Sequence, residues 1–229
     1  LWNDPDVDWS EAGMVVVRSV SDYAADRPAF LEWTKQLRRV QNSTDVLNWN
    51  TDKHYLRELS AMGLPTIPTN WLEPEQNLSK HQIHTRFPAF GEFVVKPAVS
   101  SGVRDVGRYT TVDTRQRQAA MRQVQGLLGE GRSVMIQRYV EEIDLHGEIS
   151  LVFFNGLVSH AVEKRSALHP ASVTDPSVHE AVVTAEAADS LAWKWGEEIR
   201  RVLHGYVRSR LGHDEQFLFN RVDLVPDGK

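Results

Sequence analysis

A lysine at the end of an apolar run, followed by a loop of small residues, is the clearest arrangement in this sequence that could do chemistry. The segment is FVVKPAVSSGVRDVG, residues 93–107, in which Lys96 ends the apolar run. The small residues behind it are Ser100, Ser101, Gly102 and Gly107. Small side chains let backbone N–H groups approach phosphate oxygens, and a lysine supplies a positive charge. The segment favours phosphate binding, with a tight connection and a solvated lysine as the structural alternative.

Three further segments carry polar groups at positions where chemistry is possible. Asn50-Thr51-Asp52-Lys53 places a second lysine at the expected start of a helix, where the helix dipole favours anions. IQRYV, residues 136–140, is a strand that runs into a loop, and His146-Gly147-Glu148 follows it. Arg221 and Asp223 alternate along one strand and therefore share a face, where a carboxylate suits a divalent cation that bridges phosphates. The structural alternatives are an exposed lysine and a surface ion pair.

The elements expected to position these residues alternate between short apolar runs and amphipathic stretches. Residues 14–17 read as a strand buried on both faces, and Phe30, Trp33, Leu37 and Val40 have the spacing of one helix face. Asn155-Gly156 between two apolar runs is the strongest hairpin signal, and residues 191–211 have helical spacing. This order predicts an α/β to α+β fold with two lobes and a cleft.

Composition excludes several classes of protein. With 229 residues, 41% of them hydrophobic, the chain is long enough for a substantial core. A net charge of -5 argues against nucleic-acid binding, and no apolar run approaches the roughly 20 residues of a membrane span. The absence of cysteine excludes disulfides and a cysteine nucleophile, and Arg108 after Gly107 excludes a Walker A loop. Without a secretory leader, the expected location is cytoplasmic.

The order of these segments resembles the ATP-grasp superfamily over nearly the whole chain. The sequence is similar to ligases related to glutathione synthetase and ribosomal-protein glutamate ligase, and most closely to the O-ureidoserine cyclo-ligase family of cycloserine biosynthesis. The similar segments are VVVRSVSDY, WNTDKHYLRELSAMGLPTIPT, FVVKPAVSSGVRDVGRY, GEISLVFFNGLVSHAVEK and RVDLV. The resemblance implies an ATP-grasp fold, two α+β lobes with ATP in the cleft, preceded by a partial Rossmann-like pre-ATP-grasp domain. The expected domains are 1–50 for the substrate, 51–135 for the small lobe with its linking helix, and 136–229 for an incomplete large lobe.

The same resemblance implies where the nucleotide would bind. Lys53 and Lys96 would hold the α- and β-phosphates, and the loop that contains Ser100, Ser101 and Gly102 would fold over the triphosphate. Backbone groups from Gln137 through Tyr139 to Val140 would face the adenine edge. Glu148 would take the ribose hydroxyls, with Asp144 as the weaker candidate. The residue that approaches the γ-phosphate would be Lys164 or Arg165.

It also implies the catalytic groups and the reaction. Arg221 would steady the transferring phosphoryl group, Arg18 would grip the acceptor substrate, and Asp223 would bind Mg²⁺ or Mn²⁺. A guanidinium suits the acceptor site because its fork binds a carboxylate bidentately. The expected activity is an ATP-dependent carboxylate–amine ligase or cyclo-ligase acting on a small amino-acid-like substrate through an acylphosphate. The alternative is a non-catalytic ATP-binding regulatory or interaction module.

The sequence also departs from the pattern of the family. Ser21 stands where cyclo-ligase relatives tend to have an aromatic residue, so we expect a different substrate pocket. The family has further metal ligands on the strand after Asp223 and a β–α unit before the position of Leu1, so both ends are expected to be truncated. A homo-oligomer, a dimer or tetramer, is a further expectation, with no nucleic-acid or membrane partner.

Overall fold

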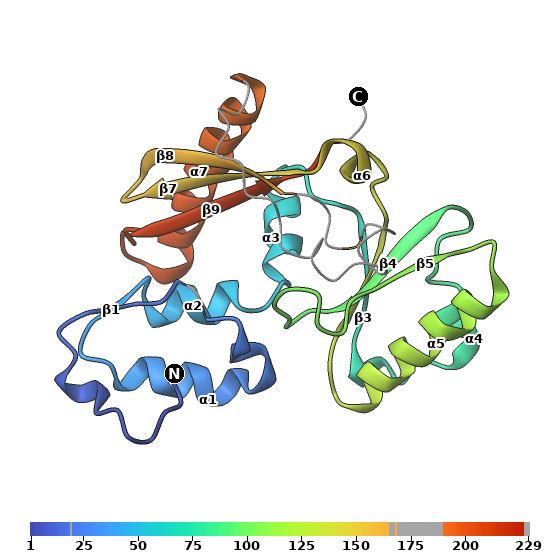
Figure 1. Cartoon of the computed structure of the whole chain (residues 1–229), viewed down its shortest axis with the longest axis horizontal. Helices are drawn as coiled ribbons and strands as arrows, with labels where there is room; N and C mark the ends of the chain where they lie inside the picture. Colours follow the sequence, from blue (N-terminus) through green and yellow to red (C-terminus); the bar gives the residue numbers. More distant parts are fainter. Residues whose placement is uncertain (19, 165–167, 169–189, 227–229) are drawn as a thin grey trace. The chain divides into compact units, whose positions relative to one another are not determined.

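The computed structural model describes residues 1–18, 20–164, 168 and 190–226 (Figure 1). The chain forms two compact units, one made of residues 1–51 with 142–229 and the other of residues 52–141. Each unit combines helices with its own strands, so the predicted α/β to α+β fold is confirmed. None of the helices in the described ranges combines the length and apolar character needed to cross a bilayer.

The first part of the discontinuous unit is a small α/β segment. Its elements are η1 (Trp9–Glu11), β1 (Val15–Val16), η2 (Asp22–Ala25), α1 (Arg27–Gln36), β2 (Val40–Gln41) and α2 (Thr44–Asn50). β1 and β2 pair in parallel, as expected for strands joined by a helical crossover. Phe30 and Trp33 of α1 are buried in an aromatic cluster with Trp2 and Trp9. The predicted helix face is correct for these two residues but α1 ends at Gln36, because Leu37 has extended backbone angles.

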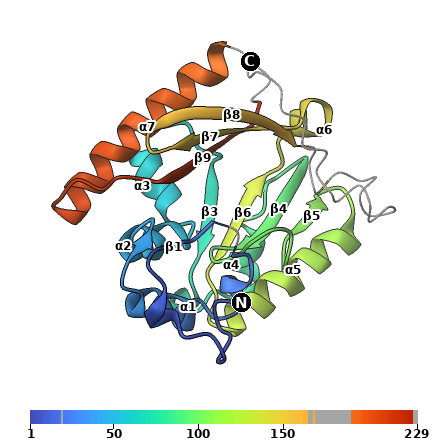
Figure 2. The same ribbon diagram turned by 60° about the vertical axis from the view of Figure 1, so that its left-hand side comes forward.

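The second part of the same unit is an antiparallel sheet covered by one long helix. β7 (Glu148–Phe154) lies between β8 (Leu157–Lys164) and β9 (Phe219–Leu224), and α6 (Glu142–His146) precedes it. The predicted Asn155-Gly156 turn joins β7 to β8, and both residues have positive φ, as a type I′ hairpin requires. α7 (Ser190–Leu211) runs along one face of the sheet and packs on Leu151 and Phe153, both fully buried (Figure 2).

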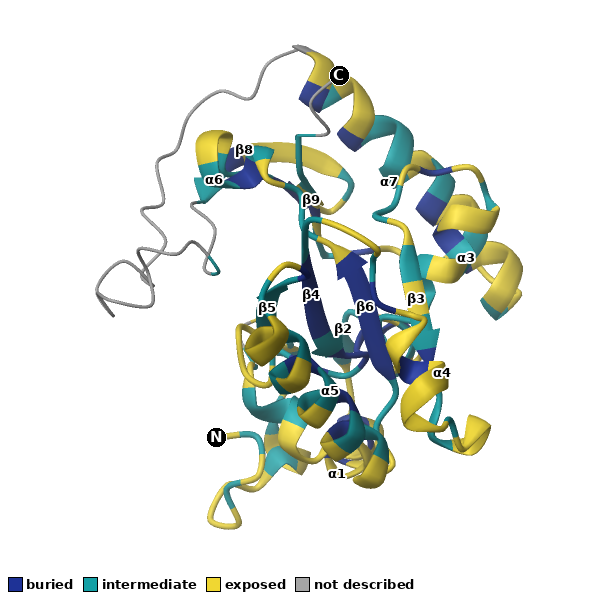
Figure 3. Ribbon diagram, turned by 90° about the vertical axis from the view of Figure 1, so that its right-hand side faces the viewer, coloured by how far each residue is buried: buried dark blue, intermediate teal, exposed yellow. Residues whose placement is uncertain are grey.

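The second unit is a four-stranded antiparallel sheet with helices on one face. The strand order is β3 (Thr69–Leu72), β6 (Val134–Arg138), β4 (Glu92–Pro97) and β5 (Gly107–Thr110). α5 (Thr114–Gly129) and the short α4 (Lys80–His84) build the core with the sheet. Figure 3 shows β4 and β6 as its most buried strands, consistent with their central place in the order. The remaining elements are α3 (Tyr55–Ala61) and η3 (Pro74–Gln76).

Candidate functional site

Lys96 projects from the face of the four-stranded sheet opposite to its helices. Along β4, Phe93 and Val95 belong to the core under α4 and α5, so the alternating residues Val94 and Lys96 point to the other face. Lys96 is paired across the strands with Met135 of β6, which is paired with Trp71 of β3. A row of directly opposed residues, Trp71–Met135–Lys96, therefore crosses this face, which we call the lysine face.

Lys53 belongs to a turn between α2 and α3, two residues before α3 begins at Tyr55. The prediction that it starts a helix was off by two residues, because His54 is the N-cap of α3 and Lys53 lies in the turn before it. Its ammonium group lies 2.7 Å from both the carbonyl oxygen and the hydroxyl of Ser100. Its backbone N–H donates to the carbonyl of Ala98 at 3.0 Å. The turn is therefore attached to the loop that follows β4.

Two lysines that lie far apart in the sequence act on one another in this unit. Burial and the positive charge of Lys96 together lower the pKa of Lys53 to about 8, although the negative charge of Asp52 acts in the opposite direction. An anion bound beside both ammonium groups would relieve the repulsion between them, which agrees with the phosphate-binding role predicted for the two lysines. The predicted pair Lys53 and Lys96 is thus brought together with Ser100.

The loop between β4 and β5 is anchored at both ends. Ser100 is buried, and its hydroxyl donates to the carbonyl of Pro97 at 3.2 Å. Ser101 is half-buried, and Gly102 is exposed with φ of +62°, a conformation that glycine adopts without strain. Near the far end, Arg132 lies 2.9 Å from the Asp105 carboxylate. Ser101 and Gly102, two of the residues predicted to fold over the triphosphate, lie between these two anchors.

In the predicted adenine hinge, some polar groups already form hydrogen bonds within the sheet and others do not. The buried Gln137 side chain donates to the hydroxyl of Thr69 at 2.7 Å, and the Tyr139 N–H donates to the Glu92 carbonyl at 2.9 Å. The Tyr139 ring lies under the Arg108 guanidinium, 3.6 Å from its centroid. Within the described residues, the backbone N–H of Val140 has no hydrogen-bond partner. Of the predicted hinge residues, Val140 therefore has a backbone N–H that is not used within the sheet.

The other unit gathers predicted residues on the face of its sheet opposite to α7. Register pairs Glu148 of β7 with Lys164 of β8, and Ser150 of β7 with Asp223 of β9. Leu151 and Val222 point to α7, so Ser150 and Asp223 point away from it. Arg221 lies on this second face as well, since it is separated from Asp223 by one buried residue. We call this surface the acid face.

Asp223 is the centre of the acid face. Its Oδ1 accepts from the Ser150 hydroxyl at 2.6 Å and lies 3.6 Å from the Lys164 ammonium, and its Oδ2 accepts from Arg221 at 2.7 Å. Burial alone would raise the pKa of this carboxyl, but Arg221, the Ser150 hydrogen bond and Lys164 outweigh burial and lower it. Asp223 is therefore ionised at neutral pH. Sequence reasoning missed Ser150, and its alternation with two apolar neighbours on β7 was the available signal.

A metal ligand at Asp223 fits the chemistry of the residues present. The described ranges contain no cluster of three or more His, Asp or Glu that could hold a metal by itself. Mg²⁺ is commonly bound by one or two carboxylates with substrate phosphates and water, so an isolated ionised carboxylate beside cationic groups suits such a shared site. Each Asp223 oxygen has more than one lone pair, which leaves acceptor capacity beyond its present donors.

Arg18 lies in the discontinuous unit, at the end of β9 away from Asp223. Its guanidinium lies 5.1 Å from the ring centroid of Phe219 and 5.8 Å from that of Phe154. Phe219 alternates with Arg221 and Asp223 along β9, so its ring belongs to the acid face. The side-chain amide of Asn42 donates to the Phe219 carbonyl at 2.8 Å, fixing the backbone of this edge strand. Arg18 and the acid face therefore share one surface.

The remaining predicted residues have plainer positions. Glu148 is the first residue of β7, and Asp144 lies in the single turn of α6. Both are half-buried. Lys164 ends β8 beside Asp223, whereas Arg165, its alternative, lies outside the described residues.

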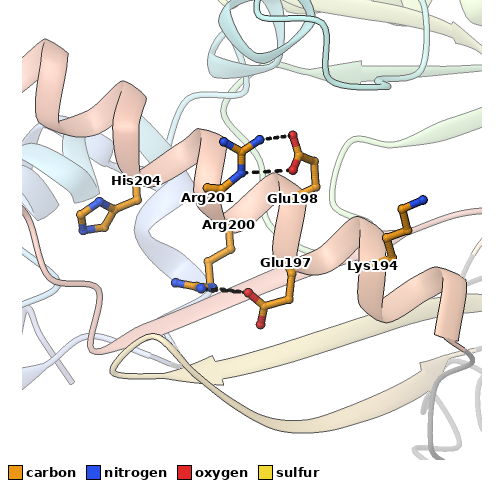
Figure 4. A pocket seen from close by; sticks show the side chains of 6 residues that line it. All are labelled: Lys194, Glu197, Glu198, Arg200, Arg201 and His204. Carbon is orange, nitrogen blue, oxygen red and sulfur yellow. Dashed lines mark hydrogen bonds and ion pairs between the residues drawn. The ribbon is translucent and has the colours of Figure 1, made fainter.

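A separate hollow of about 440 Å³ lies on the outer side of α7 and contains none of the predicted residues (Figure 4). Its two arginines are already neutralised within the helix, with Arg200 2.8 Å from Glu197 and Arg201 2.6 Å from Glu198. Among the described residues, Lys194 is the one lining cation beyond these two pairs, and the hollow contains neither of the lysines predicted to hold phosphate, so we do not assign the nucleotide to it.

Comparison with known proteins places the chain among ligases. A family model described as the N-terminal domain of the D-cycloserine synthetase DcsG matches residues 1–48. The cycloserine biosynthesis protein DcsG of Streptomyces lavendulae is 34% identical over 98% of this chain and 74% of its own length. The crystal structure of D-cycloserine synthetase DcsG superimposes with a TM-score of 0.79 at 31% identity, over 99% of this chain and 75% of that one.

A more distant structure shows the same fold. D-alanine–D-alanine ligase from Bacillus anthracis, complexed with ATP, superimposes with a TM-score of 0.60 at 16% identity, over 94% of this chain and 65% of that one. The shared architecture is that of the ATP-grasp ligases. The chain belongs to the DcsG family of these enzymes, and it is an ATP-dependent ligase that forms C–N bonds.

Proposed function

We propose that this enzyme activates the carboxylate of a small amino-acid-like molecule as an acylphosphate and joins it to a nitrogen of the same molecule. The observation that carries this proposal is the acid face, where the ionised Asp223 lies among three donors and Arg18 lies over Phe219 on the same surface. Similarity over most of its length to a D-cycloserine synthetase supports ring closure as the reaction.

The reaction has two steps. A carboxylate oxygen attacks the γ-phosphorus of ATP, the bond to the β-phosphate oxygen breaks, and ADP leaves. The nitrogen nucleophile then attacks the acyl carbon, loses a proton and expels inorganic phosphate. Positioning and charge neutralisation, which require no covalent bond to the protein, account for most of the catalysis in phosphoryl transfer.

The residues of this chain would divide that work. Lys53 and Lys96 neutralise the phosphates, and Lys164 and Arg221 stabilise the phosphoryl group during transfer. The Arg18 guanidinium binds the carboxylate of the acceptor bidentately, and residues 1–50 serve as the substrate domain. Glu148 and Asp144 are the candidates for the ribose hydroxyls. The Val140 N–H suits the adenine edge, since the neighbouring Tyr139 N–H is already taken by Glu92.

Asp223 would hold Mg²⁺ or Mn²⁺, which would neutralise negative charge on the phosphates. The Ser150 hydroxyl orients the Asp223 carboxylate, and Arg221 keeps it ionised. Lys164, 3.6 Å from the same carboxylate, would remain close enough to meet a phosphate oxygen held there.

The test follows oxygen from substrate to phosphate. Amino-acid-like candidates labelled with ¹⁸O in the carboxylate are incubated with ATP and Mg²⁺, and the released phosphate is analysed by mass spectrometry. An acylphosphate transfers one labelled oxygen to phosphate, and cyclisation gives a product that contains no second amine component. ADP release with unlabelled phosphate would overturn the acylphosphate, and a requirement for a separate amine would overturn ring closure.

Two variants connect this reaction to the site. Lys96→Met should weaken ATP binding roughly ten- to hundredfold, because one charge-assisted contact is lost. Asp223→Asn should lower kcat strongly, with only a modest effect on adenosine binding, because it removes a metal ligand and retains the shape of the side chain. Full activity of the Asn variant would exclude Asp223 as the ligand.

A further inference from the structure

His54 occupies a position that the nucleotide assignment leaves unexplained. It directly follows Lys53, and its two ring nitrogens face two carboxylates. Nδ1 lies 2.6 Å from Asp52 Oδ1, and Nε2 lies 3.2 Å from Glu73 Oε1. An ionised carboxylate only accepts hydrogen bonds, so a ring nitrogen that carries an N–H donates to the carboxylate that it faces.

The ring is also fixed from its flat side. It stacks on Trp71, with centroids 4.5 Å apart and planes inclined by 26°. Trp71 belongs to the row Trp71–Met135–Lys96 that crosses the lysine face. His54 therefore joins the turn that carries Lys53 to the same face of the sheet that carries Lys96.

Glu73, the second partner of His54, is a firmly held anchor. Arg57 donates to its Oε1 at 2.9 Å. Burial would raise the pKa of this carboxyl, but hydrogen bonds from Ser133 and His54 and the charge of Arg57 lower it. Glu73 thus stays ionised and holds His54 from the end of β3.

Asp52, the first partner, is the group that would compete with the nucleotide. It is adjacent to Lys53 in the chain, and its negative charge acts on the Lys53 ammonium in the direction opposite to burial and to Lys96. An anion beside Lys53 that lacked its own partner would repel phosphate and attract the ammonium. In the structure, Asp52 accepts from the His54 backbone N–H at 3.0 Å and pairs with the His54 ring.

We propose that His54 is a positioning residue that holds the Asp52 carboxylate away from Lys53, so that the Lys53 ammonium remains available to the phosphates of ATP. The inference rests on the proposed role of Lys53 as a phosphate ligand. It assigns His54 an electrostatic role in addition to its packing on Trp71, and the two roles have different consequences on mutation.

His54→Phe separates these roles, since phenylalanine retains a ring for Trp71 and lacks both ring nitrogens. Calorimetry at constant pH should show ATP and ADP bound about five- to tenfold more weakly, the effect of one uncompensated neighbouring charge in a partly buried place. Adenosine, which has no phosphate, should bind as it does to the parent. His84→Phe is the matched control, because His84 lies in the same unit and contacts Arg117 on the surface.

The decisive variant is the double substitution Asp52→Asn with His54→Phe. Removal of the Asp52 charge should restore ATP affinity to within about twofold of the Asp52→Asn protein, because nothing remains for His54 to hold back. Additive losses in the double variant, or equal losses for ATP and adenosine, would overturn the inference in favour of a packing role alone. Lys53→Met tests the assumption beneath it: unchanged ATP affinity there removes Lys53 from the nucleotide site, whereas a loss there with none in His54→Phe rejects His54 only.

Discussion

Ser150 and Asp223 lie directly opposite each other on β7 and β9, and the Ser150 hydroxyl donates to Asp223 Oδ1 at 2.6 Å. The hydroxyl thereby orients the Asp223 carboxylate, and together with Arg221 it lowers the pKa of this group. Loss of a group that hydrogen-bonds to a metal-binding side chain typically lowers metal affinity or activity roughly tenfold to hundredfold.

Ser150→Ala should therefore raise the half-saturating Mg²⁺ concentration roughly tenfold to hundredfold, the equivalent of one lost hydrogen bond to a charged group. ATP affinity measured without metal should be unchanged. Ser159→Ala is the control, since Ser159 is exposed on β8 and contacts only its neighbour His160 among the described side chains. An unchanged Mg²⁺ titration in Ser150→Ala would show that the hydroxyl does not direct the ligand.

The lowered pKa of Lys53, about 8, predicts how ATP binding depends on pH. Phosphate favours the protonated lysine, so ATP should bind with uptake of a proton above pH 8. Affinity should fall roughly tenfold between pH 7 and pH 9, one factor of ten for each pH unit above the pKa. Calorimetry in two buffers of different ionisation enthalpy measures the proton uptake, and Lys53→Met should abolish it. No uptake in the parent protein would mean that Lys53 is charged throughout this range.

The lowered pKa of Lys53 also predicts how the free energy of unfolding changes with pH. The folded value lies below the 10.5 of the unfolded chain, so the unfolded state binds more protons between about pH 8 and 10.5. Burial of the charged Lys53 ammonium destabilises the folded state below pH 8, and this destabilisation decreases as the pH rises through that interval. The contribution of Lys53 to the free energy of unfolding therefore increases with pH there, and a comparison of urea midpoints with Lys53→Met isolates it.

Local patterns predicted most of the fold. Asn155-Gly156 fixed the hairpin because both residues adopt positive φ, and the spacing of apolar residues from Leu191 onward predicted α7. The apolar run before Lys96 predicted a buried strand that ends at this lysine, and Phe93 and Val95 of β4 are both fully buried. These features depend on neighbours within a few residues, which is the range that periodicity describes.

Long-range pairing set the limit of prediction. Ser150 and Asp223 are 73 positions apart, and the register that opposes them depends on three strands meeting in one sheet. The position of Lys53 in a turn, and not at a helix start, follows from its bonds to Ser100 and Ala98. A family resemblance supplied the roles of these residues, but it carried no information on Ser150, His54 or Phe219.

The contact of Arg18 with Phe219 predicts that substitution of Arg18 affects the binding of the acceptor substrate and not the binding of ATP. Arg18→Ala should raise the KM of the carboxylate substrate at least tenfold and leave the KM of ATP within about twofold, since a bidentate guanidinium contact is lost. Arg18→Lys should recover little, because an ammonium lacks the planar fork. Phe219→Leu should give a smaller rise by loosening the guanidinium, and the exposed Arg38→Ala should give none. A rise confined to the KM of ATP would place Arg18 outside the acceptor site.

Two glycines of α7 provide a matched test of how closely this helix approaches the sheet. A Cβ at Gly196 would lie 2.4 Å from Leu151 Cδ1 and 3.4 Å from Phe153 Cζ, whereas a Cβ at Gly205 would meet nothing within 4 Å. Alanine is favoured over glycine in a helix by about 0.5–1 kcal/mol, so Gly205→Ala should stabilise the protein by that amount. Gly196→Ala gains the same backbone term but overpacks a fully buried contact, which costs about 1–3 kcal/mol. The net change should be a destabilisation, and urea unfolding should show the two midpoints moving in opposite directions. If both midpoints rise, α7 has room at Gly196 and the close packing on Leu151 is not a constraint on the fold.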